Sequence, residues 1–151
     1  MKALALAAAT AWSLAVPVFP NSGLLWDRFE DARVAYTLRL PPGWEATVLH
    51  GTTIVTSVPV ADRYANPERI RLPHGGVYVW IFDYGQVPGY FPARPARLAL
   101  GREKAHGCGF GEGYSLRFRD RSHLLQVFVK LGPQTGERMV LSVLDSLSVT
   151  P

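Results

Sequence analysis

The chain is poor in cysteine and has no apolar run long enough to span a membrane, and both absences limit what it can be. Cys108 is the only cysteine among 151 residues, so no disulfide can form within the chain. The apolar run near the N-terminus covers residues 3–16, fourteen residues, whereas a membrane-spanning helix needs roughly 20. We therefore expect a domain that folds without disulfides and makes no stable membrane span.

The chain also has only a small excess of positive charge. Sixteen basic and twelve acidic residues leave a net charge of +4, and thirteen of the sixteen basic residues are arginine. They are spread along the chain and form no block of the kind found in nucleic-acid-binding tails. We expect no nucleic-acid partner.

The N-terminus is the most informative segment. Lys2 precedes the apolar run, and Ser13-Leu14-Ala15 provides the two small residues that precede a cleavage point, a pattern typical of a secretory signal peptide. An uncleaved anchor or a wrongly assigned start remains the alternative. The prediction is a signal peptide over 1–15, an irregular lead-in over 16–33 and one globular domain over 34–151, located outside the cytoplasm in the secreted fraction, the periplasm or the cell envelope.

Hydrophobic periodicity predicts several strands and one helix. In residues 34–40 apolar and polar side chains alternate, which indicates a half-buried strand. Further strands are expected in a hairpin around Gly51, in the apolar segment 77–84 and in a hairpin around Arg121-Ser122, while one short helical turn is expected within 26–33.

The end of the chain changes to helical spacing. Apolar residues at 139, 140, 143, 144 and 147 predict an amphipathic helix over 136–147 with Thr135 as its N-cap. Five or six strands followed by one helix predict an α+β fold, an antiparallel sheet with the C-terminal helix packed on one face.

Two short motifs resemble those of a known group. Leu40-Pro41-Pro42-Gly43-Trp44 is similar to the L-P-x-G-W motif after the first strand of PsbP-like extracytoplasmic domains, and Val143-Leu144-Asp145-Ser146-Leu147 resembles their closing helix. The resemblance covers about residues 34–150. It implies a helix-flanked antiparallel sheet in an exported accessory protein and carries no catalytic residues.

Candidate catalytic groups are few. The glycine-rich stretch 107–113 precedes a predicted strand, whereas a phosphate-binding loop needs a helix there, so we interpret it as a bend and expect no cofactor. Cys108 with His106 or His123 is a possible thiol nucleophile and base, the basis of a thiol-dependent hydrolase as the alternative function. His106, Cys108 and His74 are too few and too widely spaced to predict a metal site.

Aromatic residues give the main candidate site. Tyr78, Trp80 and Phe82, followed by Tyr84, share one face of the predicted strand 77–84, and the next loop adds Tyr90 and Phe91. This face is either a second core layer or a partly open cleft for an apolar or sugar-like ligand. Arg117 and Arg119, with Arg121, share a face of their own strand and are either a solvated row or an anion contact.

These observations favour a non-catalytic domain. The main hypothesis is an exported ligand-binding or accessory protein of the cell envelope whose site comprises Tyr78, Trp80, Phe82, Tyr90, Phe91, Arg117 and Arg119. A protein-interaction module that binds an envelope protein is a further alternative.

Overall fold

The computed structural model describes residues 25–60, 69–86, 89–100 and 113–151. Within these ranges the chain forms two antiparallel sheets and one helix, which confirms the expected α+β fold, but the strands divide between two sheets. The smaller sheet has the order β1 (Asp27–Glu30), β2 (Tyr36–Leu40), β8 (Ser148–Val149). The larger has the order β3 (Glu45–Leu49), β4 (Thr52–Thr56), β5 (Val77–Asp83), β7 (His123–Leu131), β6 (Tyr114–Asp120).

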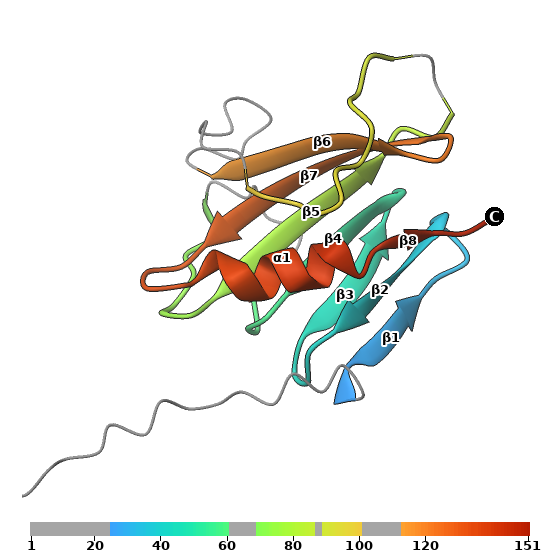
Figure 1. Ribbon diagram of the computed structural model, residues 1–151. Coiled ribbons are helices and arrows are strands. Elements are labelled where there is room, and N and C mark those ends of the chain that lie inside the picture. Colours follow the sequence, from blue (N-terminus) through green and yellow to red (C-terminus); the bar gives the residue numbers. More distant parts are fainter. Residues whose placement is uncertain (1–24, 61–68, 87–88, 101–112) are drawn as a thin grey trace, which may run out of the picture.

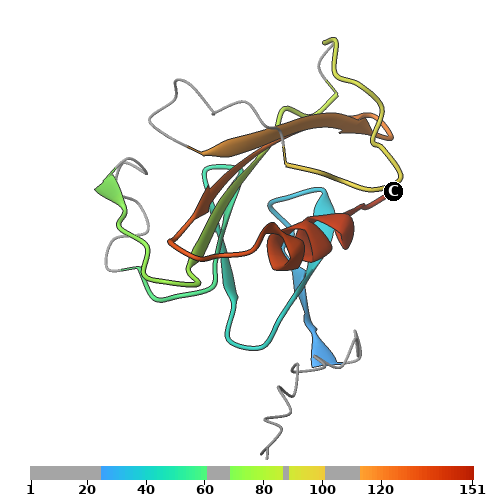
Figure 2. The same cartoon turned by 60° about the vertical axis from the view of Figure 1, so that its left-hand side comes forward.

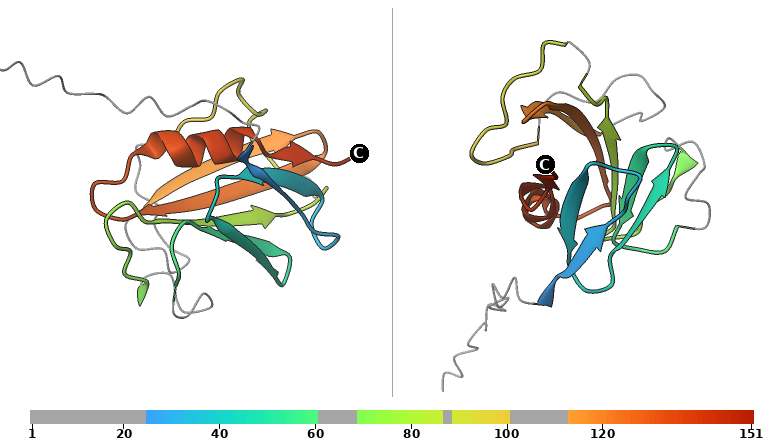
Figure 3. Two further views of the ribbon diagram at one scale, coloured as in Figure 1. Left: turned by 90° about the horizontal axis from the view of Figure 1, so that it is seen from below. Right: turned by 90° about the vertical axis from the view of Figure 1, so that its right-hand side faces the viewer.

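The molecule has two layers around one main core. The helix α1 (Glu137–Asp145) and the three-stranded sheet lie beside each other and face the concave side of the curved five-stranded sheet (Figures 1–3). The core between the layers contains buried side chains of β2, β5, β7 and α1, among them Leu38, Val79, Val127 and Val143. We call the side of the five-stranded sheet that faces away from this core its outer face.

Strand β2 confirms the predicted alternation. Tyr36, Leu38 and Leu40 are buried, whereas Arg39 is exposed. The strand ends in a tight turn in which the amide of Trp44 donates to the Pro41 carbonyl oxygen at 3.1 Å. Gly43 has a φ of 80°, which suits the third position of a type II turn and explains the glycine in the L-P-P-G-W motif.

Both predicted hairpins are present. In the first, Leu49 pairs with Thr52 across His50 and Gly51, whose positive φ values of 47° and 76° are those of a type I′ turn. In the second, Asp120 pairs with His123 across residues 121–122. The expected helical turn within 26–33 is absent, because Asp27–Glu30 instead pairs with β2 as a strand.

The helix is shorter than predicted and begins differently. It spans Glu137–Asp145, and Met139, expected on its apolar face, is exposed. Gly136 is the N-cap and provides no side-chain hydrogen bond. Thr135, the predicted cap, instead donates its hydroxyl to the Gly76 carbonyl oxygen at 3.3 Å, which ties the start of the helix to the start of β5.

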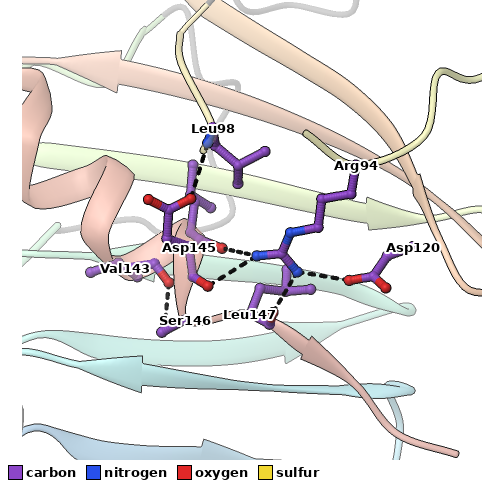
Figure 4. Close-up of polar contacts among 8 residues, drawn as sticks. Arg94, Leu98, Asp120, Val143, Asp145, Ser146 and Leu147 are labelled. Carbon is purple, nitrogen blue, oxygen red and sulfur yellow. Dashed lines mark hydrogen bonds and ion pairs between the residues drawn. The ribbon is translucent and has the colours of Figure 1, made fainter. Parts of the chain in front are cut away.

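A segment that we call the strap, residues 89–100, crosses from the edge of β6 to the helix. Arg94 fixes it there, because its guanidinium donates to Asp120 at 2.7 Å and to the carbonyl oxygens of Leu144, Asp145 and Leu147 at 3.2, 3.0 and 2.6 Å (Figure 4). The amide of Leu98 donates to the Asp145 carboxylate, and the Leu98 side chain is buried in the core. Arginine thus satisfies the carbonyl groups that the end of a helix leaves without partners.

Candidate functional site

The side chains of β5 alternate between two different faces of the sheet, as the sequence predicts. Val77, Val79 and Ile81 are buried in the main core together with apolar residues of α1. On the outer face, Tyr78, Trp80 and Phe82 follow one another with ring centroids 6.1 and 5.7 Å apart. Alternation along the strand does not determine whether other side chains cover this aromatic row.

One end of the row is closed. Tyr78 is completely buried in a second cluster with Ile54, Ile70 and Phe128. Its hydroxyl oxygen accepts a hydrogen bond from the Trp80 indole nitrogen at 2.7 Å. Neighbouring apolar side chains exclude solvent from Tyr78, so in this structure it belongs to a core layer and fixes the indole of Trp80.

The other end of the row is open. Trp80 and Phe82 are half-buried and border a shallow hollow of about 180 Å³. Phe82 makes an edge-to-face contact with Phe128 on the neighbouring strand β7, with ring centroids 5.7 Å apart. The row is thus a core layer at Tyr78 and an accessible apolar surface at Phe82. The hollow is lined by Leu49, His50, Thr52, Ile54, Trp80 and Phe82.

Four of these lining residues were not predicted as part of the site. They belong to the β3–β4 hairpin, which lies beside β5 with Thr52 opposite Phe82 and Ile54 opposite Trp80. Alternation along the hairpin would have placed Thr52 and Ile54 on one face. Sequence alone does not say which strand pairs with β5, and that pairing creates the hollow.

The strap contributes less than expected. Phe91 packs edge-on against Tyr84 with ring centroids 6.1 Å apart, and the Tyr84 hydroxyl donates to Gln126 Oε1 at 3.1 Å. Tyr90 is 99% exposed. The two predicted loop aromatics therefore act differently: Phe91 supports Tyr84, whereas Tyr90 projects into solvent and is absent from the lining of the hollow.

Arg117 and Arg119 lie at the β6 edge of the same sheet, and both are exposed. Arg117 is opposite Gln126, and Gln126 is opposite Phe82, so the register places the Arg117 side chain on the outer face with Phe82. The backbone of Arg119 also pairs with the strap, through hydrogen bonds with Pro92 and Arg94. The fold therefore brings the arginine row and the aromatic row onto one surface.

A larger hollow of about 350 Å³ lies at the three-stranded sheet, lined by residues that include Glu30, Asp31 and Tyr36. Both acidic groups have cationic partners, since Arg28 lies 3.2 Å from Glu30 and Arg33 lies 2.6 Å from Asp31. The hydrogen bonds from Arg33 lower the pKa of Asp31 to about 2. The acidic groups of this hollow are thus already paired, and its one aromatic lining residue, Tyr36, is buried, so we favour the smaller hollow.

Of the proposed thiol site, the structure describes only His123. Cys108 and His106 lie outside the described residues, while His74 is exposed. His123 Nδ1 lies 2.9 Å from the Asp83 carboxylate, which also accepts the Gly85 amide at 2.7 Å. A carboxylate that orients a histidine suits a general base, but no hydrogen bond among the described residues joins His123 to a nucleophile.

The described residues also bear on metal binding and on membrane spanning. No group of three or more potential metal ligands occurs among them, and no helix in these ranges is long and apolar enough to cross a membrane. The candidate site on the outer face comprises a fixed indole, an open phenyl ring, an apolar hollow and two exposed arginines. Comparison of the chain with protein-family models, with curated proteins and with solved structures finds no match.

Proposed function

We propose that the protein is an exported, non-catalytic domain of the cell envelope that binds a ligand on the outer face of its five-stranded sheet, at Trp80 and Phe82. One observation carries the proposal: half-buried aromatic rings border an apolar hollow instead of being closed over. A concave, mainly apolar surface lined by aromatic side chains with a few polar groups is the usual form of a small-ligand site. The signal peptide predicted over residues 1–15 supports the location.

The indole of Trp80 supplies the assay. Purified protein is titrated with a lipid and glycan extract of the cell envelope while tryptophan fluorescence is recorded. We expect a saturable shift that disappears in Trp80→Phe, since phenylalanine preserves the apolar surface but removes the reporter. Trp44→Phe is the matched control, because Trp44 packs against the main core and its loss should leave the shift in place. No shift in the folded wild-type protein would contradict the proposal.

Export is tested separately. Mass spectrometry of the protein recovered from the extracytoplasmic fraction should give a mature N-terminus at Val16, directly after the small residues of the cleavage point. An intact Met1 in the cytoplasmic fraction would contradict export.

The thiol-dependent hydrolase remains the second candidate because the Asp83 carboxylate orients His123. Alkylation separates the two functions. A reactive Cys108 in the folded protein would have a lowered pKa and would be modified rapidly at neutral pH, whereas a structural cysteine reacts only after unfolding.

A further inference from the structure

One row of residues crosses all five strands of the larger sheet on its outer face. Strand register aligns Leu49 with Thr52, Thr52 with Phe82, Phe82 with Gln126, and Gln126 with Arg117. Figure 1 shows β3 and β6 at the opposite edges of this sheet, so the row runs from one edge to the other. Its chemical character changes in order, from the apolar side chains of Leu49 and Phe82 with the Thr52 hydroxyl between them, through an amide on β7, to a cation on β6.

The dimensions of the row fit an elongated ligand. The hollow measures about 180 Å³, whereas a pocket that encloses a drug-sized ligand has roughly 300–1,000 Å³. It therefore accommodates one segment of a ligand. Neighbouring strands lie about 4.8 Å apart, so Arg117 is roughly 10 Å from Phe82 along the row. The remainder of the ligand would cover Gln126 and end at the arginine.

The lining disfavours a sugar in the hollow. Among the described lining residues, His50 and Thr52 carry polar side-chain groups, while the Trp80 indole nitrogen already donates to Tyr78. A sugar would lose many hydrogen bonds to water there and regain few, at a substantial cost in free energy. A hydrocarbon segment has no such cost.

The charge at the other end of the row is positive. Arg117 and Arg119 of β6 are both exposed. The acidic residues Asp83 of β5 and Asp120 of β6 lie on the inner face, where Asp83 contacts His123 and Asp120 contacts Arg94. Register places Glu45 on the outer face, but at β3, the edge of the sheet opposite to β6. No strand carboxylate within the described part of β6 and β7 competes for an anion on the outer face.

We infer that the ligand of this surface is a single-chain anionic lipid, with the end of its chain in the hollow beside Phe82 and its acidic headgroup over Arg117. This inference rests on the proposed function and specifies the ligand class. Charge complementarity at one end and apolar burial at the other select this occupant over a neutral glycan and over a free anion.

Isothermal titration below the critical micelle concentration tests the inference with matched probes. Decyl phosphate has the chain and a charged headgroup, a neutral decyl glycoside has the same chain with an uncharged headgroup, and inorganic phosphate has the anion without a chain. We expect decyl phosphate to bind at least fivefold more tightly than the neutral amphiphile, and inorganic phosphate not to bind. Because exposed ion pairs are weak and screened by salt, the preference should shrink in 0.5 M NaCl.

Variants assign the two ends. The double substitution Arg117→Gln, Arg119→Gln should remove the preference for decyl phosphate and leave binding of the neutral amphiphile unchanged. Phe82→Gln should weaken both amphiphiles, with circular dichroism confirming the fold. Arg138→Gln is the control, since Arg138 is an exposed arginine of α1, away from the outer face.

The outcomes separate the inference from the proposed function. Equal affinity for the neutral and anionic amphiphiles, or a preference that survives loss of both arginines, overturns the anionic lipid but leaves an apolar site. Tight binding of inorganic phosphate alone overturns the role of the chain. If neither the amphiphiles nor the envelope extract bind the folded protein, both proposals fail.

Discussion

Arg94 joins three parts of the fold that are distant in sequence, and its removal gives the sharpest test of how the strap is held. Its guanidinium donates to the Asp120 carboxylate and to three carbonyl oxygens at the end of α1 (Figure 4). It also lies 5.5 Å from the centroid of the Phe118 ring. The side chains of Arg94 and Asp120 are only about one-fifth exposed, so solvent replaces these contacts poorly.

We predict that Arg94→Met lowers the free energy of unfolding by about 3 kcal/mol, since methionine keeps the apolar stem and removes the charge. A hydrogen bond to a charged group contributes about 1.5–3 kcal/mol, and a cation at a helix C-terminus contributes about 0.3–1 kcal/mol, but the contributions of one side chain are not additive. For a domain of this size, about 3 kcal/mol corresponds to a fall of roughly 10 °C in Tm.

Thermal and urea unfolding followed by circular dichroism measure the effect. Arg97→Met is the control, because Arg97 is an exposed arginine of the same strap and its loss should change stability by less than about 0.5 kcal/mol. Asp120→Asn completes a double-mutant cycle, in which Arg94→Met should cost less once the carboxylate is gone. A loss below about 1 kcal/mol, or equal losses in the two backgrounds, would refute the reasoning.

Three further predictions follow from single side chains. Burial raises the pKa of Tyr36, and the hydrogen bond to Thr53 at 2.6 Å only partly offsets this rise. The contribution of Tyr36 to the free energy of unfolding should therefore be fully present below pH 10, the pKa of unfolded tyrosine, and should fall as the pH rises above it. Tyr36→Phe should abolish that alkaline loss and cost about 1 kcal/mol at pH 7 in urea unfolding. Gly132→Ala should destabilise by about 2 kcal/mol or more, because the added methyl group would overlap the Pro73 carbonyl oxygen; an unchanged Tm would contradict this. Gly136→Asp should raise stability by about 1 kcal/mol by supplying the missing N-cap, and no rise would show that the helix start is already satisfied.

Local patterns in the sequence were sufficient for much of the fold. The alternation through Tyr36, Leu38 and Leu40, the glycine of the first hairpin turn and the helical spacing of Val140, Val143 and Leu144 each report on neighbours a few residues apart. Side-chain period and turn geometry depend on such short separations, so these elements could be predicted without a tertiary structure. The two faces of β5 follow from the same rule.

Long-range pairing decided the rest. The short strand Asp27–Glu30 exists because β2 offers an edge, and its own four residues carry no distinctive pattern. The C-terminal segment at Val149 returns to the other edge of β2, so a single expected sheet became two. Thr135 failed as the N-cap because the Gly76 carbonyl, distant in sequence, lies within reach of its hydroxyl.

The candidate site shows the same division. The sequence by itself determined that Trp80 and Phe82 share a face, because side chains alternate along a strand. Only the tertiary structure decided that Ile70 packs in the cluster that buries Tyr78, that the β3–β4 hairpin leaves a hollow beside Phe82, and that Arg117 lies in the same row. Burial and strand order arise from contacts between segments far apart in the chain, and no periodicity within one segment encodes them.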